Sequence, residues 1–218
     1  MTIKHVLQNA SMTSAAVFLM VASASASPVS FNTNAVGTGF NNSNSNSLAS
    51  SSGNAATLSY TDNGNVTVGV PSNVNYGHFT LVCATCTTQA VGTGSSVFNS
   101  FTFKLIITDL TDGATGFFTG SSVGGTIFSD VSPITVNWVP LQLGPGTTNA
   151  TTGNFGTTFF QITSTSGIVA PNTGNPLGVT TVQGNVSSSA APEPATFGLI
   201  GASLFSLGFL RRKQGARS

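Results

Sequence analysis

A stretch of alternating apolar and polar side chains gives the strongest indication of how this chain folds. Within residues 98–110, apolar side chains occupy every second position: Phe101, Phe103, Leu105 and Ile107. Successive side chains of a strand point to opposite faces, so this segment presents one apolar face to a core. Residues 27–189 contain no helical period, and turn residues recur at short intervals. The pattern predicts an all-β body, either a β-sandwich or a jelly roll.

The same alternation, together with the turn residues that interrupt it, predicts the limits of the body. We expect a β-sandwich domain over residues 56–186, with strands at 56–62, 65–70, 76–82, 98–110, 114–118, 123–128, 134–139, 157–163 and 178–186. Asn63-Gly64 separates the first two strands and is typical of a two-residue hairpin turn. Residues 27–55 include the run NNSNSNSLASSSGN and are predicted to be a polar low-complexity lead-in, either a long loop or a flexible arm.

Charged residues are scarce, at 5% of the chain against roughly 25% in an average globular protein. Between residues 27 and 189 the one basic residue is Lys104, and four aspartates bring the net charge to −3: Asp62, Asp109, Asp112 and Asp130. A nucleic-acid-binding protein needs Lys or Arg to neutralise phosphates, so nucleic acid is excluded as a partner. An uncharged surface lacks the repulsion that keeps proteins apart. It suits a crowded matrix of neutral polymer or of self-packed protein better than the cytosol.

Residues 1–26 have the three parts of a secretory signal peptide. Lys4 and His5 form a weakly basic start, and residues 15–22 form an apolar run that is too short to span a membrane permanently. Two overlapping Ala-x-Ala sites end at Ala24 and Ala26. We expect signal peptidase to cut after Ala26, or else after Ala24.

The other end of the chain is also built in parts. A short polar linker at 187–191 leads to Pro192, Glu193 and Pro194, followed by an apolar run at 195–210. A basic cluster closes the run: Arg211, Arg212 and Lys213. The run would make a helix of about 24 Å, which is marginal for a hydrocarbon core of roughly 30 Å. The flanking basic residues can snorkel, and they would keep that end in the cytoplasm with the body outside.

The order of these parts resembles the PEP-CTERM sorting signal, and the resemblance covers residues 192–218. It implies a protein of a Gram-negative bacterium that is handled by a membrane protease, exosortase. On this reading Pro192-Glu193-Pro194 is the recognition element, residues 195–210 are the transmembrane helix and residues 211–213 are the stop. The resemblance also implies removal of the tail in envelopes that export exopolysaccharide. An ordinary membrane anchor with an incidental Pro-Glu-Pro is the alternative.

The two cysteines, Cys83 and Cys86, are separated by two residues. In an exported protein a disulfide is the expected state, with free thiols as the alternative. Closure requires a turn at Ala84-Thr85, because side chains three apart on a straight strand point to opposite faces. A redox-active pair should open a helix, and the following residues favour strand and turn. A zinc site lacks ligands, since only His78 could join the pair.

The remaining candidate residues do not assemble a catalytic, cofactor or metal site. His78 is the only histidine of the body, and the chain has no G-x-S-x-G nucleophile elbow. Asp109 and Asp112 belong to an Asp-Leu-Thr-Asp-Gly stretch that predicts a turn, and a calcium site there would need more oxygen ligands from another loop. Trp138 shares an apolar face with Ile134 and Val136, which predicts a core position.

Together these features predict an exported, non-enzymatic structural or adhesive protein of the cell surface or extracellular matrix. Its processing partners would be signal peptidase and an exosortase-like protease. A secreted carbohydrate-binding β-sandwich is the second hypothesis, and an exposed aromatic pair on one sheet would favour it. A hydrolase is the third, and it would require His78 beside an aspartate in a cleft.

Overall fold

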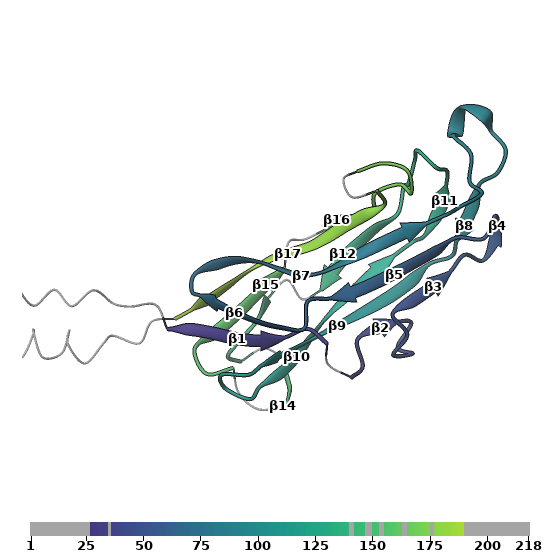
Figure 1. Ribbon diagram of the computed structural model, residues 1–218. Coiled ribbons are helices and arrows are strands. Elements are labelled where there is room, and N and C mark those ends of the chain that lie inside the picture. Colours follow the sequence, from purple (N-terminus) through teal and green to yellow (C-terminus); the bar gives the residue numbers. More distant parts are fainter. Residues whose placement is uncertain are drawn as a thin grey trace, which may run out of the picture. The chain divides into compact units, whose positions relative to one another are not determined.

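The computed structural model describes residues 27–34, 36–139, 142–146, 150–152, 155–162, 165–174 and 177–189. The strands of these residues form three antiparallel sheets (Figure 1). The all-β prediction is confirmed, and in these residues the only helical element is a 3-10 turn, η1 (Gln89–Val91). The predicted signal peptide, Pro-Glu-Pro motif, transmembrane helix and basic cluster lie outside the described residues.

The first sheet runs in the order β16 (Thr165–Gly167), β12 (Thr135–Val139), β10 (Thr115–Ser122), β9 (Phe101–Asp109), β1 (Pro28–Asn32) and β6 (Asn65–Gly69), with β14 (Ala150–Thr152) beside β10 and β2 (Gly39–Phe40) beside β9. The second sheet runs in the order β13 (Gln142–Leu143), β15 (Thr158–Ile162), β17 (Val179–Ser188), β7 (Ser72–Val82), β5 (Thr57–Asp62) and β3 (Ser47–Ala49). The third, small sheet contains β11 (Gly125–Ile127), β8 (Ser96–Phe98) and β4 (Ser52–Gly53).

Aromatic rings join the two larger sheets. Phe103 of β9 meets Phe79 of β7 with ring centroids 5.0 Å apart, and Phe31 of β1 meets Phe160 of β15 at 5.4 Å. Both pairs are edge-to-face, the arrangement that aromatic quadrupoles favour. The two sheets therefore face each other across one core.

The alternation that defined β9 is present in the structure. Phe101, Phe103, Leu105 and Ile107 are buried. Ile106 points to the other face, yet it is also buried, because the segment before β2 covers it: the backbone N–H of Ile106 donates to the Thr38 hydroxyl at 3.1 Å. The alternation therefore predicted the strand correctly, but it could not predict that the segment around Thr38 buries Ile106 on the other face.

The predicted lead-in at 27–55 is wrong as a separate loop or arm. β1 lies inside the first sheet, paired with β6 on one side and β9 on the other. Val29 and Phe31 are buried, as is Phe40 of β2. Alternation of these apolar residues brings the segment into the core. The Ser/Asn-rich composition around them concealed that pattern.

The predicted Asn63-Gly64 hairpin is also wrong. β5 pairs with β3 and β7 in the second sheet, whereas β6 pairs with β1 in the first. Gly64 takes a positive φ of 63°, and its N–H donates to the Asp62 carboxylate at 2.8 Å. The Asn63 side chain donates to the carbonyl of Asn75 at 2.6 Å, which ties the corner to β7. The dipeptide turns the chain from one sheet to the other.

Pairing of β7 with β17 is interrupted by a bulge. The register passes from Thr181 opposite His78 to Gln183 opposite Asn75, so that Tyr76 and Gly77 lie opposite the single residue Val182. All three are buried. Beyond the bulge, β17 extends two residues past the predicted end of the domain, and the N–H of Ser189 donates to the carbonyl of Thr157 at 2.9 Å.

Candidate functional site

The two cysteines close a short ring at the end of β7. The structure joins Cys83 to Cys86, with Cα atoms 5.5 Å apart and Ala84-Thr85 at the turn. The chain thus has the turn that closure of the expected disulfide requires. No α-helix follows the pair in the described residues, so the arrangement lacks the helix N-terminus that lowers a thiol pKa at redox sites. The bridge instead constrains the base of the loop that carries η1 (Figure 1).

His78 lies half-buried on the outward face of β7. Its cross-strand neighbours are Thr61 on β5 and Thr181 on β17. In the described part of the chain it forms no ion pair or hydrogen bond with an aspartate. The structure therefore does not bring this histidine together with an acid and a nucleophile.

Asp109 ends β9 in a turn. Its buried carboxylate accepts hydrogen bonds from the N–H groups of Thr111 at 2.8 Å and Asp112 at 3.3 Å, and Gly113 adopts a φ of 71°. Burial raises the pKa of the Asp109 carboxyl, and the two N–H donors oppose that rise. Among the described residues no group of three His, Cys, Asp or Glu side chains could hold a metal ion. The stretch acts as the turn that its sequence predicted.

The tryptophan and both tyrosines are part of the core. Trp138 is buried, and its indole N–H donates to the Ser166 hydroxyl at 3.1 Å. Both tyrosines, Tyr60 and Tyr76, are buried as well. No aromatic side chain in the described residues belongs to the exposed class. The exposed aromatic pair that would mark a sugar-stacking platform is thus missing from this part of the chain.

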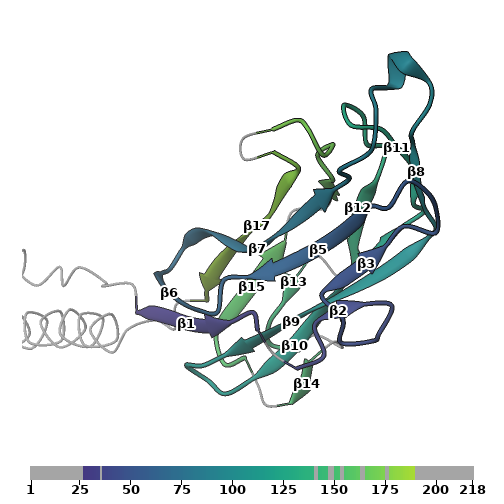
Figure 2. The same cartoon turned by 45° about the vertical axis from the view of Figure 1, so that its right-hand side comes forward.

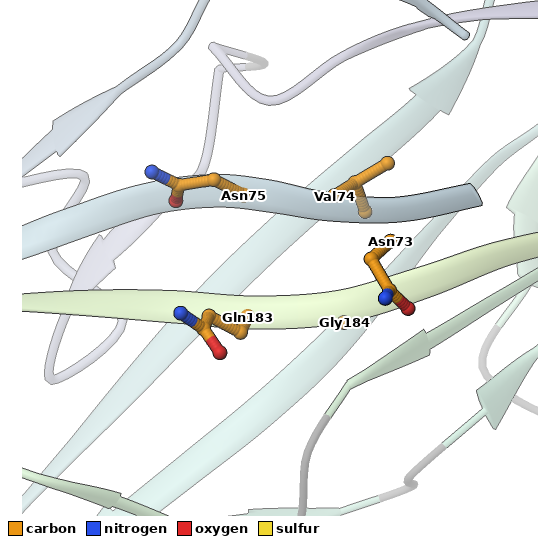
Figure 3. A pocket seen from close by; sticks show the side chains of 5 residues that line it. All are labelled: Asn73, Val74, Asn75, Gln183 and Gly184. Atoms are coloured by element: carbon orange, nitrogen blue, oxygen red, sulfur yellow. The ribbon is translucent and has the colours of Figure 1, made fainter.

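A cavity of about 460 Å³ opens at the seam between β7 and β17, next to the bulge (Figure 3). Its described lining consists of Asn73, Val74, Asn75, Gln183 and Gly184. Figure 3 shows the two strands side by side, with the carboxamides of Asn73 and Gln183 beside β17. Gly184 has to lack a side chain, because a Cβ there would lie 2.0 Å from the carbonyl oxygen of Gln161.

Carboxamides continue from this cavity across the second sheet in one row. Gln142 on β13 lies opposite Gln161 on β15, Gln161 opposite Asn185 on β17, and Asn185 opposite Asn73 on β7. The Asn185 amide donates to the Asn73 amide oxygen at 3.4 Å. We call these four residues the amide row. These four residues are not among the candidates predicted from the sequence, although Asn73-Val-Asn75 and Gln183-Gly-Asn185 repeat amides at the spacing of one strand face.

A comparison with protein-family models matched the PEP-CTERM protein-sorting motif over residues 190–213. This chain carries a PEP-CTERM sorting motif. The match includes Pro192, Glu193 and Pro194, the apolar run and the basic cluster, so the resemblance that these residues suggested is confirmed. Neither the comparison with curated proteins nor that with solved structures found a match.

The PEP-CTERM motif indicates an exported protein that is sorted at the membrane by an exosortase. It covers residues 190–213 and leaves the β body outside the match. Within the described residues no helix is long and apolar enough to cross a membrane. The motif therefore indicates how the protein is exported and sorted. It gives no information about the role of the β body.

Proposed function

We propose that this protein is a non-enzymatic structural or adhesive component of the cell surface or extracellular matrix. The PEP-CTERM motif at residues 190–213 is the observation that carries the proposal. The predicted signal peptide, with cleavage after Ala26 or Ala24, would start export. The predicted transmembrane helix at 195–210 would hold the chain in the inner membrane while an exosortase-like protease acts near Pro192-Glu193-Pro194.

A non-enzymatic role is supported by the placement of the reactive side chains. His78 lies between threonines on an outward sheet face, and the Asp109 carboxylate accepts a backbone hydrogen bond within its own turn. Cys83 and Cys86 are bonded to each other. These positions give the hydrolase hypothesis no catalytic pair in the described residues.

The surface of the proposed β-sandwich body supports a place among neutral polymers. Residues 27–189 contain five charged side chains, and the lone lysine, Lys104, lies over the Phe117 ring at 4.4 Å. A protein with so little charge gains little from electrostatic repulsion and tends to associate. In a crowded matrix that tendency is useful, whereas a freely diffusing protein would be exposed to aggregation.

The proposal is tested by replacing Pro192, Glu193 and Pro194 together with alanine in the native host. Parent protein should lose its tail and reach the surface or matrix fraction, with an N-terminus at Ser27 or Ser25. The variant should remain full-length in the inner membrane, with its body still accessible to protease outside, because the signal peptide and the basic cluster still set topology.

A matched control replaces Ser187, Ser188 and Ser189, at the end of β17 and just before the motif, with alanine. It should be processed like the parent. Processing of the Pro-Glu-Pro variant at the parent's rate would contradict the sorting assignment. Recovery of the mature parent in a soluble fraction, absent from the surface and matrix, would contradict the structural role.

A further inference from the structure

The outward face of the second sheet carries no charge. The outward positions of β5 and β7 are Thr57, Ser59, Thr61, Asn73, Asn75, His78, Thr80 and Val82, and those of β15 and β17 include Phe159, Gln161, Thr181, Gln183, Asn185 and Ser187. No described outward position on this sheet holds Asp, Glu, Lys or Arg. Lys104 lies on the other sheet. The face therefore offers hydrogen-bonding groups and no charged side chain at its described outward positions.

The amides around the cavity are only partly used within the protein. The Asn75 oxygen accepts the Gly77 N–H at 2.9 Å, and the Gln183 amide donates to the Thr181 hydroxyl at 3.3 Å. The Asn73 oxygen accepts from Asn185. In the described residues the Asn73 and Asn75 nitrogens and the Gln183 and Asn185 oxygens have no partner. The cavity thus presents donors and acceptors together.

A ligand for such a site must donate and accept at closely spaced points without carrying charge. A hydroxyl group does both, and a neutral carbohydrate presents several hydroxyls on each ring. An anionic polymer would need Lys or Arg, which this face lacks. The cavity of about 460 Å³ lies within the range of roughly 300–1,000 Å³ that small-ligand sites occupy.

The amide row extends the site beyond a single sugar unit. Neighbouring strands lie about 4.8 Å apart, so four carboxamides on four adjacent strands span about 14 Å. A polymer lying across β13, β15, β17 and β7 would meet an amide at each strand before reaching the cavity. Individually weak neutral hydrogen bonds then add up along one chain.

We propose that the amide row and the adjacent cavity bind a neutral polysaccharide through its hydroxyl groups. This inference rests on the proposed surface or matrix role and names the partner of the body. The site reads hydroxyls with carboxamides and does not use aromatic stacking. It therefore differs from an exposed aromatic pair, which would mark a sugar-stacking platform.

The test measures retention of full-length detergent-solubilised protein in gels that contain a neutral polysaccharide: a dextran, a β-glucan, a mannan or a galactan, with alginate as the anionic comparison. The parent should be retarded by at least one neutral polymer and less by alginate. Asn73→Ala with Gln183→Ala should weaken that binding about ten-fold, because two hydrogen-bonding amides are lost. Gln142→Ala with Gln161→Ala, at the far end of the row, should weaken it less.

The matched control changes Ser47→Ala and Thr57→Val, which lie on the same face away from the row and whose side chains make no hydrogen bond in the described residues. It should bind like the parent, and urea midpoints should show that all variants are folded. Absence of binding to every neutral polymer, preference for alginate, or unchanged binding by both amide variants would overturn the inference. If the parent instead forms oligomers that the Asn73/Gln183 variant dissolves, the face is a self-association surface and the glycan inference is wrong. None of these outcomes affects the fractionation that tests surface delivery.

Discussion

The hydroxyl group of Tyr60 donates a hydrogen bond to the backbone carbonyl of Tyr76 across 2.6 Å inside the core. The hydroxyl of Tyr76 in turn lies 3.1 Å from the carbonyls of both Gln161 and Asn185. The two tyrosines thus connect β5, β7, β17 and β15 by side-chain bonds that cross the sheet beside the bulge. Gly77 makes this possible, because a Cβ there would lie 2.4 Å from the Tyr60 oxygen.

This network predicts that Tyr60→Phe destabilises the body. The substitution keeps the ring and leaves the Tyr76 carbonyl buried without its donor, at a cost of about 1–2 kcal/mol in the free energy of unfolding. Urea denaturation of variant and parent measures the difference. Ser59→Ala, one residue away on the outward face, is the control and should change the midpoint little. An unchanged midpoint for Tyr60→Phe would show that the bond contributes nothing to stability.

The same burial predicts the alkaline behaviour of the protein. Burial raises the pKa of Tyr60 and of Tyr76 above the ordinary tyrosine value, and the nearby Asp62 charge adds to the shift at Tyr60. The folded state therefore prefers the neutral phenol, and stability falls as the pH rises above about 10. These are the protein's only two tyrosines. Tyrosinate absorbance should thus appear together with loss of near-ultraviolet circular dichroism, and tyrosinate formation in the folded protein near pH 10 would refute this.

Much of the fold followed from alternation, because a period of two reports directly on which face of a strand is buried. It located β9, β12 and β15 to within a few residues. The pairing of the strands, in contrast, could not be predicted from alternation. Asn63-Gly64 has the local chemistry of a hairpin, yet the Asn63 amide bonds to the carbonyl of Asn75 and the flanking strands join different sheets. A dipeptide specifies a turn, and distant contacts decide what the turn connects.

The candidate binding face could be predicted only in part. The spacing of Asn73 and Asn75 on one strand, and of Gln183 and Asn185 on another, is visible in the sequence. Their alignment depends on the bulge, which inserts one extra residue on β7 and sets Asn185 opposite Asn73. That register arises from packing around Tyr76 and Gly77. No local sequence signal encodes it.

Asp109→Asn is predicted to remove part of the pH dependence of stability. Because burial raises the pKa of this carboxyl, the folded state binds its proton more tightly than the unfolded chain does. Its favourable contribution is therefore complete below about pH 3.9 and is lost as the pH rises through the raised pKa. An amide does not titrate, and its oxygen can accept the same N–H groups. The variant should be at least as stable as the parent at pH 7 and gain less from acidification.

Urea midpoints between pH 3 and pH 8 test this prediction. Val36→Ala, at an exposed side chain that does not titrate, should keep the parent's pH profile. Asp109→Ala should lose about 1–3 kcal/mol, because it leaves buried N–H groups without an acceptor. Equal slopes for the parent and Asp109→Asn would mean that the carboxyl is not perturbed by folding.

The disulfide is predicted to contribute modestly to stability. Its ring is short, so in the chain-entropy account its removal costs about 2 kcal/mol. Cys83→Ala with Cys86→Ala should lower the urea midpoint by that amount, and reduction of the parent should have a similar effect. Alkylation should label neither cysteine before reduction and both afterwards. Two reactive thiols in the unreduced exported protein would contradict the bridge.

The two ends of the body are predicted to respond differently to truncation, although the start of β1 and the end of β17 lie at the same end of the body (Figures 1 and 2). At the C-terminal side the last buried side chain among the described residues is Val186. The Ser189 N–H forms the last described backbone bond. A chain ending at residue 191 should therefore keep the parent's unfolding midpoint. Removal of residues 27–34 should abolish cooperative unfolding, because β6 loses its partner and the Phe31 ring leaves its contacts with Tyr76 and Phe160.

A milder substitution keeps this last prediction measurable when the deletion fails to fold. Phe31→Ala should cost about 3–5 kcal/mol, a large part of a total stability of about 5–15 kcal/mol. Val36→Ala, just after this segment, is the matched control, because that side chain is 92% exposed and should contribute little. Urea denaturation followed by near-ultraviolet circular dichroism compares the exported variants. If the chain lacking residues 27–34 unfolds cooperatively at the parent's midpoint, the segment is a removable arm and β1 does not belong to the core.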